Sequence, residues 1–420
     1  MKICGNREFE LLKKIGFVRV SGSAEEERAA GILLEELKDI GVEGKMETFE
    51  VTDAVQTMAT FEVLEPYQKS YEVTCYRCAG DTPAEGLTAE FAYIEEAMDA
   101  NLTGIEGKFV LLHGRLTPEI YQKLLQANIA GYMTFSGTIL DKEEETDLPT
   151  PILRERLSKF GTVPTLNIRA KDAMELVRDK AAKVRITAKS ASQTLTSRNV
   201  IATLPGTQYP EEIIAFGAHF DSVPFSTGVY DNGAGSVIIM ELLRYFKENP
   251  PARTLQFMWY GSEEVGLLGS KAYVAAHQEE LKKYRLMINV DVAGAILGKD
   301  TAMVTAEQSL ADYTDFLFKQ AGMAVGVKQD IYSSDSIPFA DAGVPGINFC
   351  RFGAPGAAFI HDRRDVIDFL SAESLEQTTE KVLLFADKMV NAGVMPVPRT
   401  MPQNMVEKID EYLFKEKKEK

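Results

Sequence analysis

Histidine and carboxylate side chains follow several apolar, strand-like runs of this chain, and both side-chain types bind divalent metal ions. His219 and Asp221 come shortly after the apolar run 212–216, and a helix-like run begins at Ser236. Because successive side chains of a strand alternate between its faces, His219 and Asp221 lie on one side. A carboxylate beside an imidazole can hold one ring nitrogen and leave the other for a metal. The pair predicts a metal ligand, His219, oriented by Asp221, although alone it also fits a surface histidine with a local carboxylate contact.

Further residues of the same types follow other strand-like runs, at points where the chain turns toward a helix. Asp231 and Asn232 precede the helix-like run, and Glu263 and Glu264 follow the apolar run 255–260. In an open α/β sheet such strand ends meet at the carboxyl edge, where ligands bind. We therefore expect one site at that edge, which also includes two later candidates: Asp291 after 287–290, and His361 with Asp365 after the strand-like 345–349.

The order H-x-D, D-N, E-E-x-G-L-x-G-S, N-x-D and a late H-x-x-x-D resembles the di-zinc exopeptidases of metallopeptidase clan MH. This clan includes the bacterial leucyl aminopeptidase and glutamate carboxypeptidase group, and the resemblance covers roughly residues 195 to 370. It implies two divalent ions, most simply zinc, with manganese or cobalt as substitutes, and a cis peptide bond before Asn232. It also implies five metal ligands, of which Asp231 bridges the ions: His219, Asp231, Glu264, Asp291 and His361.

The same resemblance implies catalytic roles for residues that are not ligands. Glu263 is expected to face the attacking water as general base, since neighbours at a strand end point apart and Glu264 faces the metals. Asp221 would support His219, and Tyr332, which precedes a Ser-Asp pair, is the closest candidate for supporting the oxyanion. The chain also has Asp362 where the family commonly has threonine.

The resemblance therefore implies a zinc metallopeptidase, a hydrolase that we expect to be an aminopeptidase acting on short peptides. A carboxypeptidase or dipeptidase is the main alternative, since Arg351, Arg363 and Arg364 could grip a substrate carboxylate. Alternatively, these three arginines are surface residues that balance the charge of an acidic protein. A glutaminyl cyclase would need only one metal, and an inactive receptor or interaction module would not need the base Glu263.

Composition limits the partners and the location. The net charge of −16 at pH 7 disfavours binding to nucleic acid and to anionic membranes. No stretch approaches the roughly 20 apolar residues of a membrane span, and the first residues lack the apolar core of a signal peptide. We therefore predict a cytoplasmic protein. Its 4 cysteines do not form a disulfide framework, and Cys75 and Cys78 are expected to be structural thiols.

The pattern of elements predicts an α/β protein whose mixed, largely parallel β-sheet is flanked by helices. A chain of 420 residues is expected to form two domains. We assign residues 1–55 and 191–396 to a catalytic domain, and the β-rich insert 56–190 resembles a protease-associated (PA) domain. Such an insert should narrow access to the metals and favour short peptides. Residues 397–420 are predicted to form a linker and a helix that could pack on its own chain, pair in a homo-oligomer, or fray.

Overall fold

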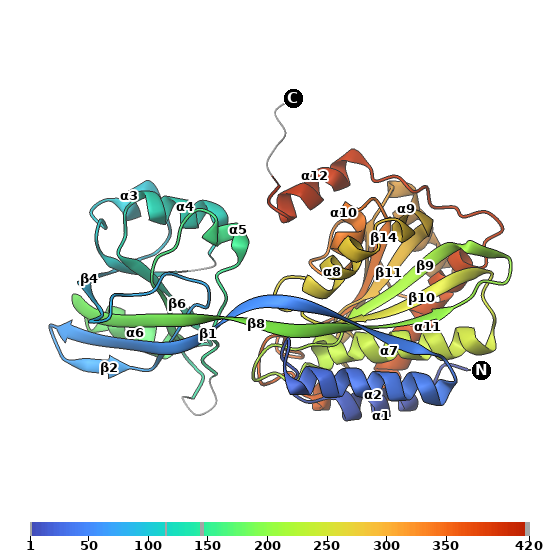
Figure 1. Cartoon of the computed structure of the whole chain (residues 1–420), viewed down its shortest axis with the longest axis horizontal. Coiled ribbons are helices and arrows are strands. Elements are labelled where there is room, and N and C mark those ends of the chain that lie inside the picture. The colour runs from blue at the N-terminus through green and yellow to red at the C-terminus, as the bar shows by residue number, and fades with distance from the viewer. Residues whose placement is uncertain (1, 114–115, 143–146, 416–420) are drawn as a thin grey trace. The chain divides into compact units, whose positions relative to one another are not determined.

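The computed structural model describes residues 2–113, 116–142 and 147–415, and it divides into two compact units. The larger unit contains residues 1–51 and 196–420, and the smaller contains residues 52–195. The predicted bounds of the insert were 56–190. The chain passes from one unit to the other within two long strands, β1 (Gly44–Glu65) and β8 (Lys183–Leu204), which pair with each other (Figure 1). The boundaries therefore fall inside strands rather than in loops.

The larger unit is built on a mixed, largely parallel sheet with the order β13-β12-β14-β11-β9-β10-β8. The four central strands run parallel to one another, whereas β8 is antiparallel to β10 and β12 is antiparallel to β14. This architecture confirms the predicted fold class. The strands not yet given bounds are β9 (Tyr209–His219), β10 (Arg253–Tyr260), β11 (Tyr284–Val290), β12 (Gly298–Thr305), β13 (Gly326–Gln329) and β14 (Gly346–Gly353).

Helices cover both faces of this sheet, because its central strands carry apolar side chains on both sides. Phe216 and Phe257 stack 4.7 Å apart on one face, and Met258 and Tyr260 lie on the other. The first face is covered by α1 (Gly5–Ile15), α2 (Ala24–Ile40), α7 (Ala234–Glu248), α9 (Gln308–Gln320) and α11 (Ala372–Val390). The second is covered by α8 (Leu268–Ala276), α10 (Ser336–Asp341) and α12 (Gln403–Tyr412) (Figure 1). Short single-turn helices are η2 (Val229–Gly233), η3 (Glu280–Lys283) and η4 (Ile367–Phe369).

The first two helices begin in different ways. The sequence predicts a helix that begins with a capping box at Ser23 and Glu26 and ends at Gly41. In α2, the Ser23 side chain accepts a hydrogen bond from the Glu26 amide, and Gly41 ends the helix with φ at 74°, which confirms this prediction. Helix α1 has no side-chain cap of its own. Instead, the amide of Gly5 donates to Glu376 of α11. This helix was not predicted, because its cap comes from a residue distant in the sequence.

The C-terminal helix α12 packs on its own chain, which was one of the three predicted alternatives. Its Met405 and Ile409 are buried, and Ile409 joins an apolar cluster with Leu267 and Ile337. The Tyr412 hydroxyl lies 2.5 Å from that of Ser333. Residues 416–420 of the predicted segment lie outside the described residues. Across the described chain, none of the helices has the length and apolar character required to cross a membrane.

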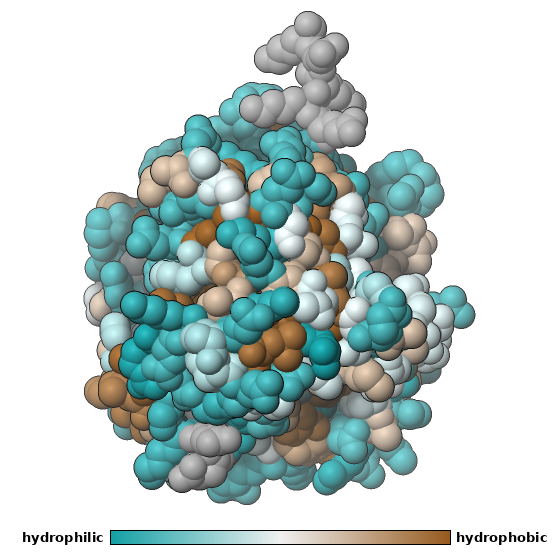
Figure 2. Space-filling view, turned by 90° about the vertical axis from the view of Figure 1, so that its left-hand side faces the viewer, coloured by the Kyte–Doolittle hydropathy of each residue, from teal (hydrophilic) through white to brown (hydrophobic). Residues whose placement is uncertain are grey.

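The smaller unit contains a second sheet region, in which β4, β5, β6 and β7 run parallel and β3 and β8 flank them in antiparallel pairing. Two apolar clusters form its core. The face shown in Figure 2 is mainly hydrophilic, with apolar residues scattered among the polar ones. The elements are β2 (Lys69–Tyr71), β3 (Val73–Cys75), β4 (Leu87–Ile94), β5 (Phe109–Leu112), β6 (Gly131–Ser136), β7 (Thr165–Arg169), α3 (Asp99–Leu102), α4 (Pro118–Gln126), α5 (Glu155–Ser158) and α6 (Ala170–Arg178).

Candidate metal centre

The candidate ligands meet at the carboxyl edge of the four central parallel strands. His219 is the last residue of β9, and Asp291 directly follows β11. Glu264 lies in the turn after β10, and His361 lies in the segment after β14. Asp231 belongs to η2, the turn that leads into α7. Since parallel strands end at the same edge, residues that are more than a hundred positions apart converge there.

These five side chains form two groups that share Asp231. In the first group, His219 Nε2 lies 3.2 Å from Asp231 Oδ1 and 3.6 Å from Asp291 Oδ1. In the second, His361 Nε2 lies 3.3 Å from Asp231 Oδ2 and 3.0 Å from Glu264 Oε2. The two oxygens of Asp231 thus serve different groups, which is the arrangement that a carboxylate bridging two ions requires.

The spacing of these atoms fits zinc. Ligand atoms about 2.0–2.2 Å from a tetrahedral zinc ion lie about 3.3 Å from one another. The distances within both groups fall close to this value. In addition, Asp291 Oδ1 is buried and has no hydrogen-bond partner among the described residues. Imidazole nitrogens and carboxylate oxygens suit zinc, so the residues present fit the ions that the resemblance implies.

Two further carboxylates, those of Asp221 and Asp365, accept hydrogen bonds from the backbone of the segments that contain the candidate ligands. Asp221 Oδ1 lies 3.5 Å from His219 Nδ1, and its two oxygens accept hydrogen bonds from the amides of Glu263 (3.0 Å) and Glu264 (3.2 Å). Asp365 accepts hydrogen bonds from the amide of Asp231 (3.1 Å) and from the preceding amide (2.8 Å). Asp221 therefore supports two strand ends at once, and its role toward Glu263 and Glu264 was not predicted.

Asn232 connects the bridging position to the neighbouring strand. The peptide bond between Asp231 and Asn232 is cis, as the resemblance implied. The Asn232 side chain donates to the carbonyl of Val290 (2.8 Å) and accepts from the amides of Gly235 (2.9 Å) and Val292 (3.2 Å). These bonds tie the turn that carries Asp231 to the strand end that carries Asp291.

The site attracts cations strongly. Burial lowers the pKa of His219, but the surrounding carboxylates, Glu263 first among them, outweigh burial and raise this pKa well above its usual value. Hydrogen bonds to Asp231 and Glu264 raise the pKa of His361 to about 11. Burial, followed by repulsion from Asp231, raises the pKa of Glu264 to about 7. The raised pKa values of these three groups indicate a concentration of negative charge in the site, which divalent ions would offset.

The structure places the remaining predicted residues as follows. Tyr332 is half-buried, and burial together with the nearby charges of Asp291 and Asp231 raises the pKa of its hydroxyl. Asp362 pairs with Arg364, with Arg364 Nη2 2.6 Å from Asp362 Oδ2, so the charge that replaces the family's threonine is neutralised locally.

Arg351, which the sequence left as a candidate for gripping a substrate carboxylate, has a structural role instead. It is buried, and its Nη1 lies 2.6 Å from Asp300 Oδ2. Its Nε donates to the carbonyl of Ala295 (2.7 Å). A guanidinium held by these partners is unavailable to a substrate.

Two residues of the site region were not predicted from the sequence. Asp335 is fully buried, accepts a hydrogen bond from Ser270 (2.5 Å), and its charge contributes to the raised pKa of Glu263. The sequence marked Asp335 only as part of the Ser-Asp pair that follows Tyr332, without a role at the site. Arg19 is fully buried beneath the loop between Asp221 and Asp231, and no sequence pattern linked it to the site.

Comparison with known proteins agrees with this geometry. Over 380 residues the chain is 28% identical to aminopeptidase YwaD of Bacillus subtilis (strain 168), covering 87% of this chain and 79% of that protein. It is 25% identical to carboxypeptidase Q of Bos taurus over 334 residues, which cover 73% of this chain and 70% of that protein. The fold is similar to that of BSAP, a zinc aminopeptidase from Bacillus subtilis, with a TM-score of 0.78, 22% identity, and coverage of 97% of this chain and 99% of that one. Residues 199–386, which contain all five candidate ligands, match peptidase family M28. This part of the chain is therefore similar to peptidase family M28, a family of clan MH.

Proposed function

We propose that the protein is a zinc-dependent aminopeptidase that removes N-terminal residues from short peptides. The observation that carries this proposal is the pair of metal-type groups that share Asp231, beside a carboxylate, Glu263, that neither group uses. We assign His219 and Asp291 to one ion and Glu264 and His361 to the other. Two zinc ions in such sites lower the pKa of the attacking water and stabilise the negative charge of the tetrahedral transition state.

Glu263 is suited to move the proton. Burial raises the pKa of Glu263 well above its usual value, although His219 opposes the shift, and bound cations would bring the pKa back toward the working range. The carboxylate would accept a proton from the attacking water and donate it to the nitrogen of the leaving amine. Its backbone amide is fixed by Asp221, so the carboxylate starts from a defined position. We propose Tyr332 as the hydroxyl that supports the oxyanion, because it lies close to the ligand carboxylates.

The charge around the site favours a substrate amine over a substrate carboxylate. Asp221, Glu263, Asp335 and Asp365 add carboxylates to the three that bind the ions. Arg351 is committed to Asp300. A protonated α-amino group is therefore attracted, and a free C-terminal carboxylate is repelled. The similarity to carboxypeptidase Q keeps carboxypeptidase activity as the second candidate.

A set of four peptides tests the choice between these activities. The same tetrapeptide is supplied with both termini free, with an acetylated N-terminus, with an amidated C-terminus, and with both termini blocked. An aminopeptidase cleaves the free and amidated forms and releases the first residue. A chelator such as 1,10-phenanthroline should abolish this cleavage, and zinc should restore it. Cleavage of the acetylated peptide from its C-terminus would establish a carboxypeptidase instead.

We also propose a cytoplasmic location. The four cysteines, Cys4, Cys75, Cys78 and Cys350, are all unpaired, which suits a reducing compartment. Fractionation of the native host, followed by immunodetection, tests this proposal. Recovery of the protein from the culture medium or from an oxidising compartment would contradict it.

A further inference from the structure

The segment 17–23, between α1 and α2, contacts the backbone that carries the metal site although it lies far from that site in the sequence. Its Arg19 is fully buried. The Arg19 guanidinium donates hydrogen bonds to the carbonyls of Phe220 and Thr227, to that of Gly228 (2.6 Å), and to that of Phe17 in its own segment (3.0 Å). Two of these four carbonyls, those of Thr227 and Gly228, belong to the loop that joins Asp221 to Asp231, and that of Phe220 directly precedes the loop.

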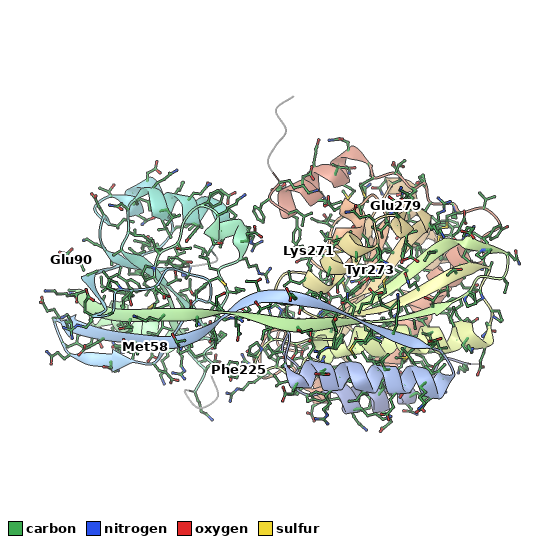
Figure 3. The ribbon with its side chains drawn as sticks, viewed as in Figure 1. Met58, Glu90, Phe225, Lys271, Tyr273 and Glu279 are labelled. Carbon is green, nitrogen blue, oxygen red and sulfur yellow. The ribbon has the colours of Figure 1, made fainter. Side chains whose placement is uncertain are left out.

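The main chain of Arg19 reinforces this contact. Its amide donates to the Ser222 hydroxyl (3.0 Å), and its carbonyl accepts from the Ser222 amide (3.2 Å). The tip of the loop is more open, because the side chain of Phe225, labelled in Figure 3, is 48% exposed. Arg19 thus holds both ends of a loop whose middle faces solvent.

The loop has little room to change its path near Asp231. Gly228 has a φ of 55°, and a Cβ at this position would lie 2.7 Å from the carbonyl oxygen of Asp231 and 3.2 Å from Arg19 Nη2. The guanidinium therefore packs directly against the turn that presents the bridging carboxylate. A planar group with five N–H donors can fix several carbonyls in one arrangement, which a lysine ammonium cannot reproduce.

Arg19 also brings positive charge close to the carboxylates of the site. Burial lowers the pKa of Arg19 to about 10, although Asp365, Asp221 and Asp231 raise it. The side chain is therefore a cation at neutral pH. The same segment reaches the neighbouring strand end, where the Ser21 hydroxyl lies 2.5 Å from that of Ser262, the residue before Glu263.

We propose that Arg19 is a positioning residue for the metal centre, which it serves by fixing the loop between Asp221 and Asp231. This inference rests on the proposed function, since it concerns the affinity of the site for its ions. Arg19 lies outside the residues that match the peptidase family, 199–386. Loss of a residue that orients metal ligands typically weakens metal affinity about 10–100-fold.

The experiment compares Arg19 with a matched buried arginine elsewhere in the same unit. Arg253 is 1% exposed, and its Nη1 donates to three carbonyls, with distances of 3.4, 3.2 and 2.6 Å, but these carbonyls belong to residues 389–392. Zinc affinity is measured by competition with a chelating indicator for the unmutated chain, Arg19→Lys, Arg19→Met and Arg253→Met. Unfolding of the metal-free form of each variant is measured in parallel.

We expect both arginine-to-methionine variants to unfold at lower temperature than the unmutated chain when metal-free. Only the Arg19 variants should bind zinc more weakly, by about 10–100-fold for Arg19→Met and by less for Arg19→Lys. The cobalt-substituted Arg19→Lys variant should show an altered visible absorption spectrum, whereas cobalt-substituted Arg253→Met should not. Ser222→Ala provides a milder variant if Arg19→Met does not fold, and it too should weaken zinc binding.

Equal zinc affinity in Arg19→Lys, Ser222→Ala and the unmutated chain would overturn the inference and leave the proposed function standing. Equal weakening in Arg253→Met would also overturn it, because general destabilisation would then explain the effect. If the unmutated chain binds no zinc, the proposed function fails, and the inference fails with it.

Discussion

The amide of Glu263 donates a hydrogen bond of 3.0 Å to Asp221 Oδ1, so the proposed general base is held by a residue two positions after His219. The other oxygen of Asp221 accepts from the amide of Glu264. One carboxylate therefore sets the relative positions of two strand ends, one with a proposed ligand and the other with both a ligand and the base. Asp221 therefore holds the backbone of Glu263 and Glu264 and also lies 3.5 Å from the imidazole ring of His219.

Replacement of Asp221 by asparagine tests this double role. An asparagine side chain has one acceptor oxygen, so one of the two amides would face an NH2 group instead. We expect kcat to fall about 10–100-fold and zinc affinity to fall with it. Steady-state kinetics at saturating zinc, together with zinc titration, measure both effects. If affinity fell and kcat at full zinc occupancy did not change, Asp221 would support His219 alone.

The division of labour between Glu263 and Glu264 gives a second prediction. Glu263→Gln should lose several orders of magnitude in kcat and retain both zinc ions, because only proton transfer is removed. Glu264→Gln should lower zinc occupancy, since Glu264 Oε2 lies 3.0 Å from His361 Nε2 in the second group. Metal content by mass spectrometry, measured beside kcat, separates the two. Equal metal content in the two variants would show that the assignment is wrong.

Local signals in the sequence predicted one part of the fold and missed another. The α2 boundaries follow from Ser23 and Gly41, whose effects act within a few residues. Helix α1 begins where the backbone amides of Cys4 and Gly5 donate hydrogen bonds to carboxylates of α7 and α11. These partners are distant in the sequence, so the local sequence gives no sign of them. Similarly, the sequence predicts two separate strands, at 45–52 and 60–63, whereas the structure has one continuous strand, β1, which pairs with β8.

In the site, too, the sequence predicts the residues that follow a local pattern but not those that depend on distant partners. The candidate ligands could be proposed because each follows a strand-like run and their order resembles a known family. The residues that support those ligands could not be assigned from the sequence, since Arg19 reaches the site from a segment that shares no motif with it and Asp335 was marked only by its place after Tyr332. The correction for Arg351 has the same cause, because its buried partner Asp300 lies 51 positions away.

Glu26 provides a prediction about pH. Burial raises the pKa of Glu26 from 4.5 to about 8, although the Ser197 hydroxyl opposes the shift. A carboxyl group whose pKa is raised by folding stabilises the fold while it is protonated, and this contribution is lost as the pH rises from 4.5 to about 8. In Glu26→Gln the side chain keeps its shape but cannot ionise. Its amide group can still form hydrogen bonds with the Ser197 hydroxyl and the Gly22 amide.

We therefore expect Glu26→Gln to unfold at nearly the same temperature as the unmutated chain at pH 5 and at a higher temperature at pH 8. Thermal unfolding at pH 5, 6.5 and 8 measures the difference. Glu27→Gln is the matched control, because the Glu27 side chain is 67% exposed in the same helical turn. A difference between Glu26→Gln and the unmutated chain that does not grow with pH would contradict the prediction.

The smaller unit gives the last prediction. We propose that this unit, whose sequence resembles a protease-associated domain, restricts the enzyme to short peptides. Removing residues 52–195 and joining Val51 to Thr196 should therefore change KM and the preference for substrate length more than it changes zinc affinity. The full chain should cleave a dipeptide and a decapeptide but leave an intact folded protein uncut, because a narrow entrance excludes folded chains. Zinc titration of the shortened chain shows whether its metal centre has formed. With that centre formed, an unchanged length preference would mean that the unit does not select substrates.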